Sequence, residues 1–187
     1  MTAVRKARLP LPAFLRKSLL ALHVALSVGW LGAAAAYLSI AVAALASGEA
    51  ERMRAAYPTL ELLGWCVIVP LCLAALISGV VQSLGTPWGL FRHYWVVAKL
   101  ALTLVATGVL LGHMPAVGHA ARQAALPAAS VADLGHVPVQ LVVHAAGGIV
   151  VLLAVVAISV FKPWGLTPLG ARSQRALARA DGKAGDS

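Results

Sequence analysis

Residues 84–114 read LGTPWGLFRHYWVVAKLALTLVATGVLLGHM, and this stretch decides the fold of the chain. Pro87 and Gly89 break a helix, and the arginine, histidine and aromatic residues at 92–95 favour the boundary between lipid headgroups and hydrocarbon. Between residues 96 and 111 the only ionisable side chain is Lys99, so this run can cross the roughly 30 Å hydrocarbon layer. The stretch therefore predicts a turn at a membrane surface followed by one transmembrane helix.

The composition of the whole chain agrees with a membrane setting. Hydrophobic residues make up 60% of the 187 residues and charged residues 11%, a balance that a soluble domain of this size does not carry. Apolar runs close to the roughly 20 residues that a span requires occur at about 19–46, 62–82, 94–113 and 139–161. We expect an all-α protein, a bundle of four transmembrane helices.

Basic residues flank these runs. Five lysine and arginine residues lie in the arm 1–17, and the tail 167–187 is basic as well. The positive-inside rule places both ends in the cytoplasm, around a transmembrane domain at 18–166. The predicted location is the bacterial cytoplasmic membrane, with the lipid bilayer as the main partner. The net charge of +9 does not indicate nucleic-acid binding, because the basic residues flank spans instead of forming a patch interleaved with aromatics.

The sequence also predicts three local features, two in the segments between the spans and one within the second span. Residues 48–58 predict a short, solvated external connector, after which Thr59 caps the second helix with its side chain. Pro70 predicts a kink within that helix, because proline has no N–H to donate. Residues 115–138 predict the longest external connection, so that His113 closes the third helix.

The chain also carries the mark of an internal repeat. The block Pro-Trp-Gly-Leu at 87–90 recurs at 163–166, an offset of 76 residues, and the same offset aligns Tyr37 with His113. Matches between apolar residues arise easily by chance in such a composition, but a match of the whole Pro-Trp-Gly-Leu block does not. We predict two tandem helix hairpins of the same orientation, related by an axis along the membrane normal.

Ionisable side chains within spans are costly, so each is a candidate functional residue. His113, at the outer end of the third helix, and His144, in the fourth, lie on consecutive antiparallel helices and are expected to face each other. Neutral imidazoles on facing helices suit axial ligation of haem b, and Gly147 and Gly148 leave space for a flat macrocycle. The helix stripe that reaches His113 also carries Lys99, near the inner surface.

A second histidine pair is predicted at the inner end. His23 and His93 form this pair, and Lys99, Arg16 or Arg92 neutralises the haem propionates there. In the first span one stripe is expected to face protein: His23, Ser27, Trp30, Ala34 and Tyr37.

Each of these residues also has a plainer interpretation. His93 and His113 suit the aromatic belt at a membrane surface, His23 suits a hydrogen bond to a neighbouring carbonyl, and Lys99 can extend to the cytoplasmic surface. A transition metal is a further chemical option, with His113 and His144 as its main ligands. The wider set of outer residues considered for that metal is His113, Met114, His119, His136 and His144.

The sequence contains no phosphate loop, nucleophile elbow, zinc-protease motif or pair of carboxylates, and Glu61 is the only carboxylate near a span. Hydrolytic chemistry is therefore a poor fit. We expect a membrane protein that binds haem b for electron transfer or haem handling. Two alternatives stay open: a cofactor-free accessory or structural subunit that docks a partner membrane protein or a second copy, and a small metal or cation transporter.

The block from Leu84 to His113, with Lys99 inside it, resembles a family of small four-helix bacterial membrane proteins of unknown function. The first span, with LHVALSVGWLG, and the closing His144 with KPWGL are similar too, so the likeness covers nearly the whole chain. This resemblance implies a fold and a location but no activity. More distantly, the plan resembles membrane b-type cytochromes and copper-resistance membrane domains, a likeness of architecture that does not confer function.

Overall fold

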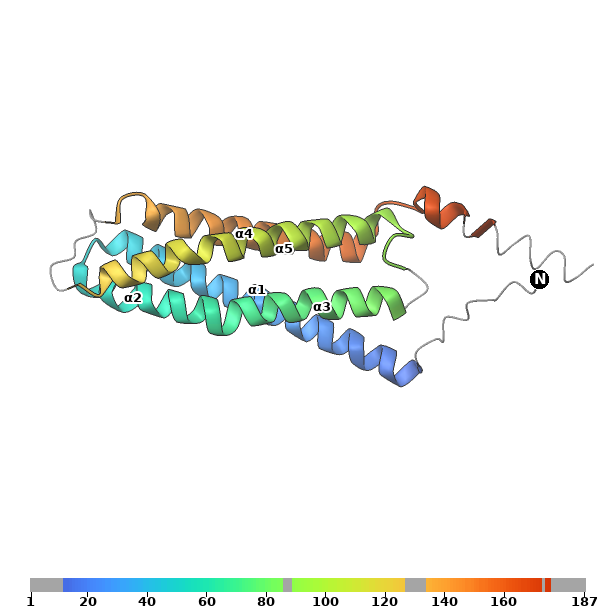
Figure 1. The fold of residues 1–187 in the computed structure, drawn as a ribbon, viewed down its shortest axis with the longest axis horizontal. Helices are drawn as coiled ribbons and strands as arrows, with labels where there is room; N and C mark the ends of the chain where they lie inside the picture. The colour runs from blue at the N-terminus through green and yellow to red at the C-terminus, as the bar shows by residue number, and fades with distance from the viewer. Residues whose placement is uncertain (1–11, 86–88, 127–133, 173, 176–187) are drawn as a thin grey trace, which may run out of the picture.

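The computed structural model describes residues 12–85, 89–126, 134–172 and 174–175. Its helices lie side by side in an elongated bundle (Figure 1). They are α1 (Ala13–Ser47), α2 (Ala50–Leu63), the π-helix η1 (Gly64–Ile68), α3 (Val69–Gly85), α4 (Tyr94–Ala124) and α5 (Val137–Phe161). Because α2, η1 and α3 follow one another without a break, they form one continuous helix, Ala50–Gly85, and the bundle contains four long helices in the described residues.

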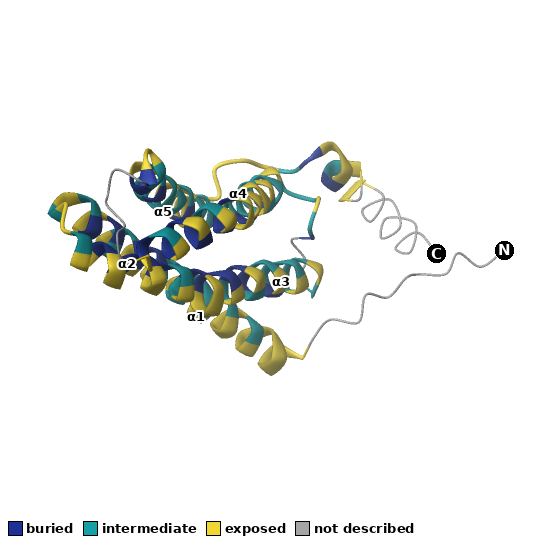
Figure 2. Ribbon diagram, turned by 60° about the vertical axis from the view of Figure 1, so that its left-hand side comes forward, coloured by how far each residue is buried: buried dark blue, intermediate teal, exposed yellow. Residues whose placement is uncertain are grey.

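The length and surface of these four helices suit a bilayer. They contain 35, 36, 31 and 25 residues, and at 1.5 Å per residue even the shortest is about 37 Å long, more than the hydrocarbon thickness of roughly 30 Å. Exposed residues cover the outer faces (Figure 2), and they include large apolar side chains such as Val28, Ile77 and Val150, each more than 60% exposed. The chain is therefore an all-α, multi-pass membrane protein, as its composition predicts.

One face of α1 packs into the bundle, and most residues on this face are small. Small side chains let helix backbones approach closely, and α1 contacts both α3 and α5. The predicted protein-facing stripe of this helix is confirmed for its second half, Trp30, Ala34 and Tyr37, which is buried. Its first half, His23 and Ser27, is partly buried. The buried row is Trp30, Ala34, Tyr37, Ala41 and Ala44.

The external connector predicted at 48–58 is wrong. Only Gly48 and Glu49 separate α1 from α2, and Thr59 lies inside α2, where its hydroxyl donates to the carbonyl of Ala55 instead of capping the helix. The reason is an apolar face on an otherwise polar segment, which packs against α4. Met53, Ala56, Tyr57 and Leu60 are buried at helical spacing.

The predicted end of the third helix at His113 is also wrong. α4 continues through Pro115 to Ala124, because Val117, Ala120 and Ala121 supply a buried face beyond the proline. Pro115 itself is exposed, so its ring lies away from the packed face. The predicted loop 115–138 shrinks accordingly, and its residues 127–133 lie outside the described part of the chain. His113 therefore lies well inside a transmembrane helix.

Pro70 changes the helix in a way that differs from a simple kink. The π-helix η1 immediately precedes it, and the N–H of Val69 donates to the carbonyl of Gly64, five residues earlier. A proline at 70 has no N–H for the carbonyl of Cys66, and a local shift to the wider hydrogen-bond pattern accommodates that gap. Gly64 and Ile68, at the two ends of η1, are both buried.

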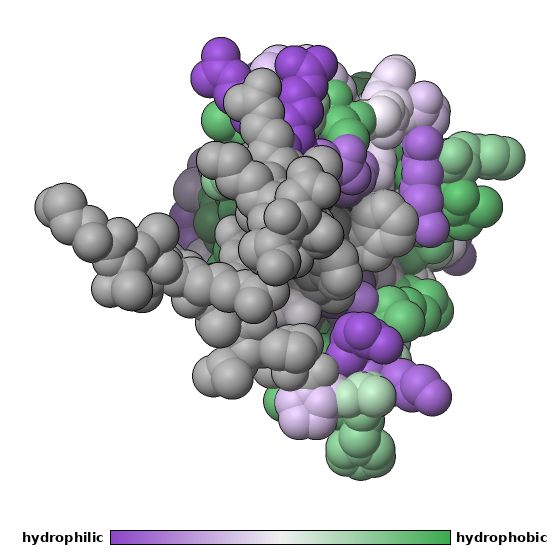
Figure 3. Space-filling view, turned by 90° about the vertical axis from the view of Figure 1, so that its right-hand side faces the viewer, coloured by the Kyte–Doolittle hydropathy of each residue, from purple (hydrophilic) through white to green (hydrophobic). Residues whose placement is uncertain are grey.

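α1 begins and α5 ends at the same end of the bundle (Figure 1). Hydrophilic side chains gather on this end (Figure 3). The predicted basic arm is shorter than expected, because residues 13–17 belong to α1, and residues 1–11 and 176–187 lie outside the described part. That this end faces the cytoplasm stays a prediction, which reporter fusions to the C-terminus would test.

The segment after α5 binds back onto the start of α4. The Thr167 N–H donates to the carbonyl of Arg92 at 3.0 Å, the Thr167 hydroxyl donates to the carbonyl of Phe91 at 2.6 Å, and the Tyr94 N–H donates to the carbonyl of Gly165 at 3.3 Å. The contacts of Thr167 join the residues that directly follow the two Pro-Trp-Gly-Leu blocks, while Gly165 lies within the second block. The repeat itself stays a prediction, since Pro87 and its tryptophan neighbour lie outside the described residues.

We expect Gly170→Ala to disrupt this docking. A Cβ at Gly170 would overlap the backbone carbonyl of Arg92, whereas a Cβ at Gly165 would meet no atom within 4 Å, so Gly165→Ala is a matched control. The overlap should cost about 1–3 kcal/mol, as overpacking typically does. Limited trypsin digestion at exposed Arg172 and thermal unfolding in mild detergent measure the effect. Equal digestion rates for the two variants would contradict the docking.

Candidate functional site

His113 is a buried polar residue without a partner. It projects from the middle of α4 into the bundle, its side chain is only 8% exposed, and neither ring nitrogen has a hydrogen-bond partner. A buried polar group left unsatisfied costs about 1–3 kcal/mol. A group retained at this cost is a candidate for ligand binding.

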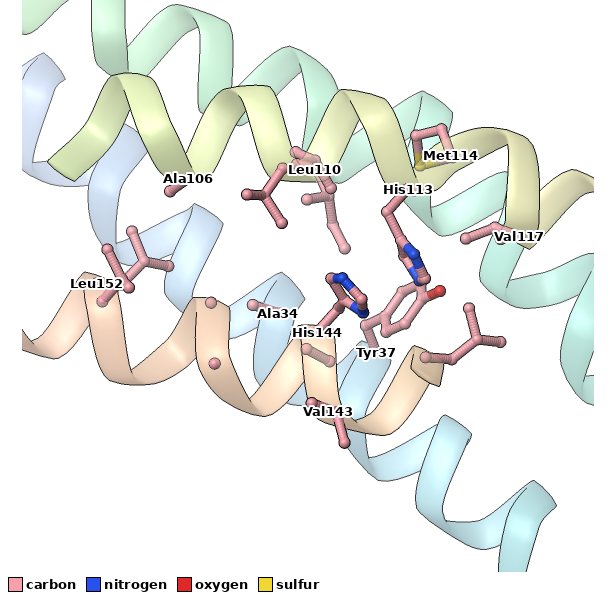
Figure 4. Close-up of a pocket in the computed structure, with 18 of the residues that line it drawn as sticks. Ala34, Tyr37, Ala106, Leu110, His113, Met114, Val117, Val143, His144 and Leu152 are labelled. Atoms are coloured by element: carbon pink, nitrogen blue, oxygen red, sulfur yellow. The ribbon is translucent and has the colours of Figure 1, made fainter. Parts of the chain in front are cut away.

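His144 of α5 lies against His113. The two rings are stacked, with centroids 4.2 Å apart and planes inclined by 14° (Figure 4). The Nδ1 of His144 lies 2.8 Å from the carbonyl of Gln140. Because a carbonyl can only accept, Nδ1 carries the proton, and the lone pair of His144 Nε2 stays available. The prediction that the two histidines face each other across α4 and α5 agrees with this geometry.

Tyr37 of α1 completes the polar group. Its side chain is 6% exposed and its hydroxyl has no hydrogen-bond partner. Tyr37 lines the same cavity as His113, and Figure 4 shows both side chains among those around it. The sequence placed Tyr37 on the protein-facing stripe of α1 but did not assign it to the histidine site. The signal that could have assigned Tyr37 to this site was a tyrosine hydroxyl on a protein-facing stripe at the same depth in the bundle as His113.

These three side chains line a cavity of about 250 Å³. Its walls come from α1, the start and end of η1, α4 and α5, and its lining contains no lysine, arginine, aspartate or glutamate among the described residues. Gly147 and Gly148 line it too, and a Cβ at either position would meet no atom within 4 Å. The predicted open space beside His144 therefore exists.

The cavity reaches the lipid-facing surface between α4 and α5. Val105 and Val109 of α4 and Val143 of α5 line it, and these side chains are 62%, 48% and 60% exposed. Side chains that belong both to the cavity wall and to the outer surface mark an opening between the two helices. A molecule dissolved in the hydrocarbon can enter there without crossing water.

A haem between the two imidazoles does not fit this arrangement. With about 2 Å from each nitrogen to the iron, axial ligation would hold the ring centroids roughly 6 Å apart, whereas they are stacked at 4.2 Å. No basic side chain among the described residues lines the cavity to neutralise propionates. The donor chemistry suits haem, but its insertion requires α4 and α5 to separate and the rings to turn.

The other predicted pair lies at the opposite half of the bundle. His23 Nδ1 is 2.9 Å from the hydroxyl of Ser78, and its ring packs over Gly79. Because the Ser78 hydroxyl donates to the carbonyl of Ala75, it accepts from His23. This is close to the plainer interpretation of His23, a structural hydrogen bond to a neighbouring helix.

His93 and Lys99 lie near the start of α4. His93 forms an antiparallel bridge with Leu166, and its ring centroid lies 6.1 Å from that of Trp95. The Lys99 amine lies 5.9 Å from the centroid of the Trp95 ring, a cation–π distance. The pairing of His93 with His23 on a second haem stays a prediction.

Few side chains of the described residues are placed to bind a metal ion together. The described residues contain no group of three or more histidine, cysteine, aspartate or glutamate side chains that could hold a metal ion. His119 and His136 are exposed, and Met114 is buried against Gly64. His113 and His144 alone are brought together.

The fold and the cavity thus define a multi-pass helical membrane protein with a buried, partly unsatisfied histidine pair. Comparison of the chain with protein-family models, with curated proteins and with solved structures finds no match. The resemblance to a family of small four-helix membrane proteins therefore stays a prediction, as do the predicted protein partners.

We expect replacement of His113 to leave the folded protein as stable as before. His113→Leu removes two unsatisfied nitrogens without opening a cavity, so the change in stability should be neutral or favourable. Leu141→Ala is the comparison, because Leu141 is 0% exposed and its truncation should cost about 2–5 kcal/mol. Thermal unfolding in mild detergent measures both. A loss for His113→Leu as large as that for Leu141→Ala would assign His113 a structural role.

Proposed function

We propose that this protein binds a neutral, ring-bearing molecule from the lipid phase in the cavity between α4 and α5. The observation that carries the proposal is His113, which lines the cavity and whose two buried nitrogens lack partners, as does the buried hydroxyl of Tyr37 in the same lining. Binding of a ligand with its own polar atoms satisfies these groups, which helix packing leaves unsatisfied. The proposed setting is the bacterial cytoplasmic membrane, with both termini inside.

A photoreactive probe tests the proposal. We would equilibrate the purified protein in mild detergent with an octyl-substituted phenyl diazirine, irradiate it, and map the labelled residues by mass spectrometry. His113 and Met114 are 8% and 2% exposed, so detergent-dissolved probe reaches them only through the cavity. We expect label on both residues.

Gly148→Leu is the blocking variant. Gly148 lies one turn after His144 on the same face of α5 and lines the cavity, where a leucine side chain has space to fill it. Gly32→Leu is the matched control, because Gly32 is exposed on α1, outside the cavity, and a Cβ there also meets no atom within 4 Å. Label on His113 and Met114 should fall to background in Gly148→Leu and persist in Gly32→Leu. Unlabelled wild type, or equal labelling of both variants, overturns the proposal.

We propose haem b as a second candidate ligand of the same site. The favouring observation is the hydrogen bond from His144 Nδ1 to the carbonyl of Gln140, since metal-ligating histidines commonly anchor their second nitrogen in this way. His113 and His144 would hold the iron after α4 and α5 separate, and the haem would supply one-electron chemistry.

Visible spectra decide this second candidate. Protein purified from haem-replete cells should show a Soret band in its oxidised and reduced spectra, and His144→Ala should lose it, because one axial ligand is removed. Gly32→Leu, which changes no ligand, should keep the band. A colourless wild-type protein from such cells removes haem from consideration and leaves the ring-binding proposal intact.

A further inference from the structure

Three side chains that line the cavity carry a specific set of free donors and acceptors. The Tyr37 hydroxyl is unpaired, and so are both nitrogens of His113, one of which carries a proton in a neutral imidazole. His144 Nε2 offers a lone pair, because its Nδ1 donates to Gln140. The site therefore holds two free donors, on Tyr37 and His113, and two ring-nitrogen acceptors, on His113 and His144.

We propose that the ligand of this cavity belongs to the quinone class, a neutral ring with two oxygens and an apolar tail, held by Tyr37, His113 and His144. This inference rests on the proposed function and names its ligand.

Two ring oxygens match the free groups in both redox forms of such a molecule. A quinone presents two carbonyl acceptors, which pair with the hydroxyl of Tyr37 and the N–H of His113. A quinol presents two hydroxyl donors, which pair with the free nitrogens of His113 and His144. A ring with a single oxygen satisfies fewer of these buried groups than a ring with two, at a cost that penalises its binding.

The charge and the opening of the cavity agree with this class. The described lining contains no ionisable side chain other than histidine and tyrosine, so a charged headgroup would be desolvated without a counter-charge. The opening lies between exposed Val105 of α4 and exposed Val143 of α5. An apolar tail can leave the cavity there and remain in the hydrocarbon.

The volume fits a ring head but not a whole tailed molecule. A buried apolar cavity of about 150 Å³ accommodates benzene, and this one has about 250 Å³, which leaves space for ring oxygens and substituents. Pockets that bury whole drug-sized ligands have roughly 300–1,000 Å³. The ring therefore enters and the tail stays outside.

Competition against the photoreactive probe tests the inference. The competitors are a fully substituted decyl benzoquinone, its quinol, and decylbenzene, which has the same tail and no oxygen. Full substitution leaves no ring C–H to which the exposed thiol of Cys66 could add. We expect the benzoquinone and the quinol to remove label from His113 and Met114 at concentrations at least about tenfold lower than decylbenzene, as two hydrogen bonds imply.

Variants assign this selectivity to the named groups. Tyr37→Phe and His113→Leu should each reduce the preference for the benzoquinone over decylbenzene several-fold, while Gly32→Leu should keep it. Equal competition by benzoquinone, quinol and decylbenzene in a wild type that is labelled overturns the quinone inference but leaves the ring-binding function standing. Absence of cavity label in the wild type overturns the proposed function itself, so the two failures are distinguishable.

Discussion

The hydrocarbon of a bilayer offers no hydrogen bonds, and this constraint determines how polar side chains within the described helices are paired. Most hydroxyl groups in the long helices donate to the carbonyl one turn earlier, as Ser27 does to His23 and Thr107 to Thr103. His23 pairs with Ser78, and Cys72 lies 3.1 Å from the Thr107 hydroxyl. Hydrogen bonds within one helix or between neighbouring helices make a polar residue compatible with the membrane. Tyr37 and His113 depart from this pattern, and both face the same cavity.

Hydropathy predicts the four helices well because it measures the property that the bilayer selects. It fails at their ends for a physical reason. The segments 50–60 and 115–124 extend the helices by packing against each other, and each carries charged or polar residues on its outward side. Hydropathy averaged over a window combines the buried and the exposed side of such a helix. The 3.6-residue spacing of Met53, Tyr57 and Leu60 instead separates the buried side from the exposed one. The predicted connection begins at Pro115, whereas a proline on the exposed side of a packed helix is tolerated.

The candidate site was predictable only in part. Placing His113 opposite His144 needs no more than two consecutive antiparallel helices and a count of residues from the turn. The stacking of the rings depends on how closely α4 and α5 approach, which no spacing along the chain encodes, and the stacked rings leave no space for a haem between them unless they move apart. Tyr37 comes from α1, whose contact with α5 is a property of the assembled bundle. The contribution of α1 to the site therefore depends on how the helices pack, which the sequence pattern of one helix does not specify.

The π-helix explains how the wall opposite His113 keeps its shape. Along the second long helix, buried residues recur at 60, 64, 68 and 72, every four positions. In a regular α-helix at 100° per residue, three such steps would rotate the buried face by about 120° and turn Cys72 away from the bundle. The wider turn of η1 absorbs most of this rotation, so the stripes of α2 and α3 both face inward. Gly64 then lies directly against the thioether of Met114. The missing N–H of Pro70 thus shapes one side of the cavity.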